Sequence, residues 1–218
     1  MSQVANPTAA LAGIPAGLQA QGLWAGRRQL FVRFAAEAET ATMYTAEALA
    51  NEIRRSTTRS TFHSISISGR DPLANVDYLL VAFAKAATAL PVMLDCDGQR
   101  PAEIAELAGI VGLVQVTLEG ATLEMQSERA FESLHVAAAA GLTHALVICI
   151  DERTTDAHVL RVVERAHAAS AATSVVVHPT AGTPVDRDRR WTTLFERVGA
   201  IHGDARLALK LPPPTGMR

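Results

Sequence analysis

The sequence predicts an α/β domain, a partial (β/α) barrel of about six to seven parallel strands. Runs of β-branched and apolar residues alternate with amphipathic helical segments, and such alternation requires right-handed crossovers and a parallel sheet covered by helices. Residues 145–150, ALVICI, form a continuous apolar run, which is typical of a parallel strand buried on both faces. No glycine-rich dinucleotide fingerprint follows the first strand. The barrel is therefore favoured over the alternative, an open doubly wound sheet.

The chain is expected to divide into an irregular N-terminal lead-in, residues 1–18, and a single barrel domain, residues 19–218. Two prolines and two glycines interrupt the lead-in, so no regular element is predicted there. Residues 19–28, QAQGLWAGRR, are rich in turn formers, and Trp24 stands between Gly22 and Gly26 as a large apolar anchor.

Seven strands and six helices are expected to follow. Apolar and β-branched runs predict the strands, at residues 30–34, 63–68, 92–95, 113–118, 145–150, 174–177 and 205–211. Apolar residues spaced three and four apart predict the helices, at residues 45–55, 75–90, 101–108, 127–140, 155–169 and 191–201. Thr45 and Ser127 are candidate N-caps, and Pro101 suits a first helical turn. Between the first strand and the first helix, residues 35–45, AAEAETATMYT, predict a shortened loop.

The composition argues against several classes of protein. A net charge of −2 provides no basic field for nucleic acid or anionic lipid, so neither partner is expected. The sequence contains no run of eighteen apolar residues and no basic segment before an apolar core near Met1; neither a membrane span nor a secretory signal is expected. The two cysteines, Cys96 and Cys149, are expected to be reduced thiols in a cytoplasmic protein.

Functional side chains are expected at the carboxyl ends of the strands, where both architectures place their sites. His178 lies at such an end and is the candidate general base, because an imidazole titrates near neutrality; a structural histidine is the alternative. Acidic strand ends would suit Mg²⁺ or Mn²⁺, but no ligand spacing supports a metal site and none is expected. The expected ligand-binding residues are Gln19, Gln21, Arg33, Ser68, Gly69, Arg70, Asp71, Asp95, Glu119, Asp151 and Lys210.

Two strand ends have more than one interpretation. Arg70 and Asp71 could form the floor of a pocket in which the planar guanidinium binds a carboxylate or phosphate. Alternatively, Arg70 pairs with Asp71 or with Glu37. On the next strand end, two aspartates flank Cys96 and are expected to raise its pKa, which would make it a poor nucleophile.

Several segments resemble the radical S-adenosylmethionine superfamily, and most closely its 7-carboxy-7-deazaguanine synthase branch. Residues 19–35, QAQGLWAGRRQLFVRFA, resemble the family's opening, in which a Q-G-E-G turn and a G-R pair precede an F-V-R strand. Residues 66–73, SISGRDPL, resemble its S-G-G-E-P-L turn for the methionyl amine. Residues 93–98, MLDCDG, and residues 141–156, GLTHALVICIDERTTD, resemble later strands. The resemblance implies a radical-SAM-like barrel and a homodimer, with Gln21 facing a heterocyclic substrate.

The departures from that family concern its cofactors. The family's C-x3-C-x2-C loop follows the first strand, whereas this chain has no cysteine before Cys96. Because thiolates hold such a cluster, the [4Fe–4S] cluster is predicted absent. Arg70 and Asp71 replace a glycine and a glutamate of the S-adenosylmethionine site, so binding of that cofactor is expected to be weak or absent. No cofactor is expected.

Two functions follow as expectations. The first is a cluster-less 7-carboxy-7-deazaguanine synthase-like pseudoenzyme that binds a small ligand or a partner. The alternative is a repurposed non-radical enzyme, a metal- or acid–base-dependent lyase or isomerase, acting on a small heterocyclic or carboxylated substrate at the barrel mouth. Whether the protein is an enzyme stays open between them. A homodimer is also expected because an incomplete barrel leaves strand edges that need cover.

Overall fold

The computed structural model describes residues 6–120, 123–179 and 189–208. Within them, a ten-stranded sheet includes seven strands that pair in parallel and lie side by side in the order of the sequence. These strands are β3 (Arg28–Phe34), β5 (Ser64–Gly69), β6 (Val92–Cys96), β7 (Leu113–Glu119), β8 (Thr143–Ile150), β9 (Ser174–Pro179) and β10 (Ala205–Leu207). The α/β class is confirmed.

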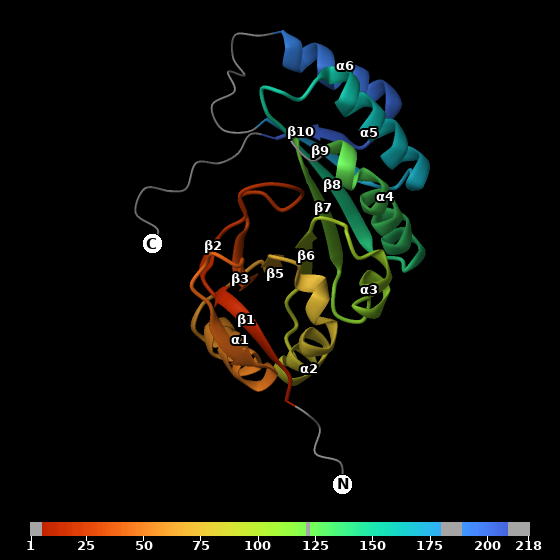
Figure 1. The fold of residues 1–218 in the computed structure, drawn as a ribbon. Coiled ribbons are helices and arrows are strands. Elements are labelled where there is room, and N and C mark those ends of the chain that lie inside the picture. Colours follow the sequence, from red (N-terminus) through yellow and green to blue (C-terminus); the bar gives the residue numbers. More distant parts are fainter. Residues whose placement is uncertain (1–5, 121–122, 180–188, 209–218) are drawn as a thin grey trace.

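The helices between these strands begin and end close to the expected positions (Figure 1). Thr45 caps the first helix by accepting a hydrogen bond from the Ala48 N–H at 3.1 Å, as predicted, and Pro101 stands in the first turn of another. Ser127 is not a cap, because its helix begins earlier, at Leu123. The helices are α1 (Ala46–Arg59), η1 (Pro72–Asn75), α2 (Val76–Ala86), α3 (Pro101–Glu106), α4 (Leu123–Ala139), α5 (Asp156–Ala169) and α6 (Arg190–Ile201).

The lead-in is not irregular where it is described. Thr8–Gly13 forms β1 and Ala16–Leu18 forms β2, both antiparallel to β3. Thr42–Thr45, within the segment expected to be a loop, forms β4 and pairs with β1. The prediction failed because β1 and β2 are built of small residues with little strand preference, and their pairing with β3 is a long-range contact that local pattern cannot show.

The sheet remains open, with β4 at one edge and β10 at the other. A partial barrel is therefore not confirmed. Alternate residues of β3 and β5 to β9 face the helices and share one core with them, including Val32, Ile67, Val116 and Ile148. Each such fully buried side chain contributes about 1.5–3 kcal/mol relative to leaving it in water.

None of the described helices covers the opposite face of the sheet. Met93, Leu113 and Ala145 form one small apolar cluster there, and Val147, Cys149 and Val176 form a second. Leu23 packs against both clusters and Trp24 against the first. The segment between β2 and β3, residues 19–27, thus covers this face, and Figure 1 shows it as a red loop reaching towards β7 and β8. Every residue from Ala145 to Ile150 is buried, which confirms the prediction made from the run ALVICI.

The structure bears on two predictions made from composition, those on membrane-spanning helices and on the two cysteines. None of the helices in the described ranges is long and apolar enough to span a membrane. Cys96 and Cys149 are both buried, and both are thiols rather than halves of a disulfide.

Candidate active site

A pocket of about 270 Å³ opens at the carboxyl ends of β5, β6 and β7. A larger groove of about 630 Å³ lies between the C-terminal ends of α1 and α2, but it is lined by hydroxyl, alanine and apolar side chains with a single arginine. The smaller pocket is lined by acidic side chains and one arginine. It lies at the edge of the sheet where parallel α/β folds place their active sites. Seven expected ligand-binding residues line it: Gln21, Ser68, Gly69, Arg70, Asp71, Asp95 and Glu119.

Asp95 is the central carboxyl of this pocket. Thr117 donates its hydroxyl to Asp95 Oδ1 at 2.8 Å. Burial raises the pKa of Asp95 above its usual range; hydrogen bonds with Thr117, Gln115 and Gln19 oppose the rise, and the negative charge of Glu119 adds to it. Since burial is the largest of these causes, Asp95 holds its proton at a higher pH than an exposed aspartate does.

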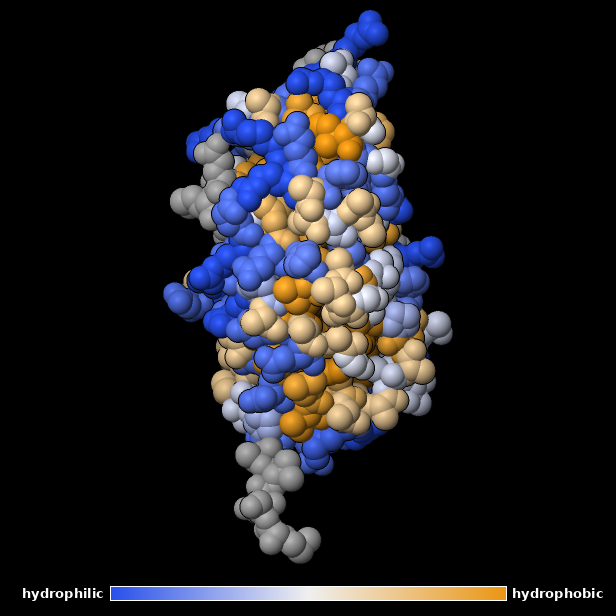
Figure 2. Space-filling model, turned by 90° about the vertical axis from the view of Figure 1, so that its right-hand side faces the viewer, coloured by the Kyte–Doolittle hydropathy of each residue, from blue (hydrophilic) through white to orange (hydrophobic). Residues whose placement is uncertain are grey.

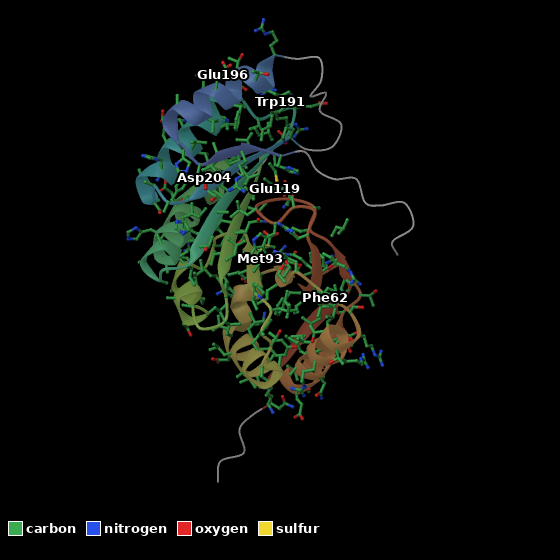
Figure 3. All side chains as sticks on the ribbon, turned by 180° about the vertical axis from the view of Figure 1, so that it is seen from behind. Phe62, Met93, Glu119, Trp191, Glu196 and Asp204 are labelled. Atoms are coloured by element: carbon green, nitrogen blue, oxygen red, sulfur yellow. The ribbon has the colours of Figure 1, made fainter. Side chains whose placement is uncertain are left out.

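Strand alternation places the partners of Asp95. Gln115, Thr117 and Glu119 lie two residues apart on β7, so their side chains share the face that carries no helix. Asp95 is the direct neighbour of Gln115 in the parallel register between β6 and β7. Glu119, at the end of β7, lies beside the β2–β3 loop in Figure 3 and is exposed. Among the carboxyls that line the pocket, Asp95 is half-buried and Glu119 is exposed.

The pocket has a cationic rim. Arg70 is exposed and forms no ion pair with any described residue; its backbone N–H donates to the Phe34 carbonyl at 3.1 Å. Asp71 pairs instead with Arg100, whose Nε and Nη2 donate to the carboxylate at 2.8–3.0 Å. The proposed pairing of Arg70 with Asp71 or Glu37 is therefore wrong within the described chain. The guanidinium of Arg70 remains available to an anion.

Arg100 is a site residue that sequence analysis missed. It lies next to α3 and reaches Asp71, 29 positions earlier in the chain. The backbone of Asp71 lies in the left-handed region, with φ 42°. In this conformation its carboxylate accepts hydrogen bonds from the Arg100 guanidinium. An arginine just before Pro101 gives no sequence signal for such a contact, because the contact depends on two neighbouring strand ends.

Other expected residues lie elsewhere. Arg33 pairs with Glu39 at 3.1 Å on the surface. Asp151 closes a local turn, in which the Thr154 hydroxyl donates to its Oδ1 at 2.7 Å. This bond, together with hydrogen bonds from the backbone N–H groups of Arg153 and Thr154, lowers the pKa of Asp151. His178 is buried and donates Nδ1–H to the Ala208 carbonyl at 2.9 Å. Lys210 lies outside the described residues.

Metal ligation and thiol chemistry have little support here. In the described part of the chain, no group of three or more His, Cys, Asp or Glu side chains is arranged to hold a metal ion. Burial raises the pKa of Cys96 to about 12, and the charges of Asp95, Asp97 and Asp71 add to the rise. The thiol therefore stays protonated and is a poor nucleophile, as the flanking aspartates led us to expect.

No protein-family model and no curated protein matches the chain. Among solved structures, the chain is similar to the apo form of 3-keto-D-glucoside 4-epimerase from E. coli, at 15% identity. The match covers 77% of this chain and 89% of the epimerase, with a TM-score of 0.35. A likeness this low says nothing about function.

The comparisons overturn the resemblance to radical S-adenosylmethionine enzymes. No model of that superfamily or of 7-carboxy-7-deazaguanine synthase matches the chain. The cluster-less pseudoenzyme interpretation was therefore wrong. Its motifs were short segments at strand ends, where small and acidic residues are common in any β/α repeat, and residues 35–41 lead into β4 and its pairing with β1.

Proposed function

We propose that the protein is a non-radical enzyme of the acid–base type, a lyase or isomerase that moves a proton on a small carboxylated substrate. The supporting observation is Asp95, a carboxyl whose pKa is raised by burial inside a pocket that also holds Glu119. A carboxyl whose pKa is raised can act as the acid, while a second carboxyl at the same pocket acts as the base. In this proposal Asp95 gives a proton to the substrate and Glu119 removes one.

Arg70 supplies the substrate contact in this proposal. Its guanidinium stands at the same pocket without an ion pair to any described residue. A planar guanidinium binds a carboxylate through two parallel hydrogen bonds. A substrate carboxylate held there would have its neighbouring carbons over the two acids. His178 is left out of the catalytic set, because its Nδ1 is engaged by Ala208.

Three further expectations remain part of the proposal. The sequential order of the parallel strands supports a partial (β/α) barrel, although the sheet is open at both edges. The two thiols support a cytoplasmic location. The open edges at β4 and β10 support a homodimer.

Proton transfer is tested by hydrogen exchange. The protein is incubated in D₂O with 2-hydroxy, 3-hydroxy and 2-oxo acids, and proton NMR follows loss of carbon-bound hydrogen and appearance of product. Asp95→Asn should reduce the rate by about 10²–10⁴, the usual contribution of a general acid or base. Asp97→Asn is the matched control, because Asp97 lines the same pocket and caps the Gln99 N–H through an oxygen that asparagine keeps. Equal rates for Asp95→Asn and wild type would refute the proposal.

A further inference from the structure

The β2–β3 loop is a closed unit that rests on the helix-free face. Its neck is formed by two backbone hydrogen bonds, Gln19 N–H to Arg27 O at 2.9 Å and Gly26 N–H to Gln19 O at 2.8 Å. Two more bonds close turns inside the loop, and the backbone of residues 20–26 donates or accepts no hydrogen bond with another described segment. Side chains alone hold the loop on the sheet, so it can lift as a unit about its neck.

The surface beneath the loop is polar where apolar contacts would be expected. Gln115 is fully buried; its Oε1 has no hydrogen-bond partner, and its Nε2 interacts only with the Asp95 carboxyl, outside normal hydrogen-bond geometry. Gly22 lies directly on this amide: a Cβ built on Gly22 would be 1.7 Å from Gln115 Oε1. Ser66 is also fully buried with an unpaired hydroxyl, and its register neighbour Met93 packs against Leu23 and Trp24.

Buried polar atoms are nearly always paired, so unpaired ones need an explanation. Here Gln115 adjoins Asp95 in the sheet register, and Asp95 lines the pocket that also contains Gln21 of the loop. The pocket measures about 270 Å³, whereas ligand pockets usually span about 300–1,000 Å³. The loop therefore occupies the space into which this pocket would extend.

We infer that the β2–β3 loop is a displaceable cover, and that Gln115 and Ser66 form a second polar subsite beneath it. The ligand is a small polyhydroxylated carboxylic acid. Its carboxylate binds Arg70, and its hydroxyl groups bind the amide of Gln115 and the hydroxyl of Ser66. A hydroxyl group both donates and accepts, so it matches the Gln115 Oε1 and the Ser66 hydroxyl, which have no hydrogen-bond partner. The inference rests on the proposed pocket as a ligand site, and not on proton transfer there.

Binding is tested by calorimetry with three aldonates, D-gluconate, D-galactonate and D-xylonate. Sorbitol, which lacks the carboxylate, and hexanoate, which lacks the hydroxyls, are the ligand controls. At least one aldonate should bind at least tenfold more tightly than either control. Failure of all three aldonates to bind would overturn the ligand class.

Gln115→Leu tests the subsite, because leucine fills a similar volume without polar atoms. It should raise the melting temperature by removing a buried carbonyl oxygen that has no hydrogen-bond partner, while weakening aldonate binding at least tenfold. Thr173→Val is the matched control: Thr173 is also fully buried with an unpaired hydroxyl, but it lies outside the pocket, so only stability should rise. If Gln115→Leu lowers the melting temperature or leaves aldonate affinity unchanged, the subsite is refuted.

Thiol labelling tests the cover. Cys149 lies under Gln21, with Sγ 4.0 Å from Oε1. Cys96 lines the pocket, but it packs in the core on the helical side and not under the loop. Trp24→Ala removes an anchor of the loop and should speed iodoacetamide labelling of Cys149 at least tenfold, with Cys96 unchanged; equal acceleration of both would indicate general unfolding and refute the cover. Aldonate binding without any hydrogen exchange would refute the proposed reaction and leave this inference standing.

Discussion

Arg100 holds the carboxylate of Asp71 through three contacts, Nε to Oδ1 at 2.8 Å, Nε to Oδ2 at 3.0 Å and Nη2 to Oδ2 at 2.9 Å. This pair joins the loop after β5 to the N-terminus of α3. Asp71 is the acid adjacent to Arg70 in sequence, and it is bound by Arg100. Arg70 is therefore the arginine that can bind a ligand. Arg70, which lines the pocket, and Arg100, which holds Asp71, therefore have separate roles.

Arg70→Gln should weaken binding of a carboxylated ligand by about tenfold or more, since hydrogen bonds to a charged group contribute about 1.5–3 kcal/mol. The free energy of unfolding of this variant should stay within about 0.5 kcal/mol of the wild-type value, because Arg70 is exposed and has no ion pair with a described residue. Arg100→Gln is the control: it should lower the free energy of unfolding slightly, because it removes a half-exposed ion pair. Calorimetry and urea denaturation measure the two effects, and equal ligand affinity of wild type and Arg70→Gln would contradict the assignment.

Gly22→Ala should destabilise the protein more than Gly141→Ala. Both glycines have positive φ, +80° and +71°, so each alanine carries a backbone cost of about 1–2 kcal/mol. Nothing lies within 4 Å of a Cβ at Gly141, whereas a Cβ at Gly22 meets the Gln115 amide. Overpacking at Gly22 should therefore lower the free energy of unfolding by about a further 1–3 kcal/mol.

Urea denaturation of both variants gives the difference. The double variant Gly22→Ala/Gln115→Ala removes the clash. Measured against the single variant Gln115→Ala, the Gly22 substitution should then lower the free energy of unfolding no more than Gly141→Ala does in the wild type. A Gly22→Ala protein as stable as Gly141→Ala would mean that the loop does not rest on Gln115.

Asp95→Asn should stabilise the protein at pH 7. Burial raises the pKa of Asp95, so the folded state binds this proton more tightly than the unfolded chain, and stability falls as pH rises through the raised value. Asparagine lacks that penalty and keeps an oxygen for the Thr117 hydroxyl. The melting temperature should rise by about 2–4 °C per kcal/mol of penalty removed, and the gain should vanish below about pH 4, the ordinary aspartate pKa.

Asp151→Asn is the control with the opposite sign. The Thr154 hydroxyl and backbone N–H groups lower the pKa of Asp151, so its carboxylate stabilises the fold above the unfolded pKa, and this stability is lost as pH falls through the folded value. Its substitution should lower the melting temperature at pH 7 and have less effect at low pH. Parallel pH profiles for the two variants would contradict the assigned causes.

A homodimer would appear in light scattering as a mass of about 46 kDa, twice the 23.1 kDa of the chain. The described edge strand β4 pairs only with β1, and its Met43 is 63% exposed. Figure 2 also shows apolar patches on the surface. Leu80, Leu90 and Ile110 line a groove between α2 and the segment after α3. Met43→Lys should give a monomer if β4 forms the interface. A concentration-independent mass near 23 kDa in the wild type would rule out the dimer.

Local patterns in the sequence were sufficient for the repeating part of the fold. Continuous apolar runs such as ALVICI and helical spacings such as that of α5 lie within single elements, so residues close in sequence reveal them. β1 and β4 could not be found this way, because each is a strand only through pairing with a segment about thirty residues away. The family resemblance failed for a related reason: short strand-end motifs recur in many β/α repeats.

The sequence by itself determined that the strands are parallel, that a pocket edge exists at their carboxyl ends, and that Arg70, Asp95 and Glu119 lie along that edge. Each of these follows from strand–helix alternation and from the position of a residue relative to the end of its own strand. Only the tertiary structure decided that Asp71 binds Arg100, that the surroundings of Asp95 raise its pKa, and that residues 19–27 cover Gln115. Those facts depend on the burial and distances of groups far apart in the chain, and the pKa of a carboxyl or the pairing of an amide is set by such neighbours.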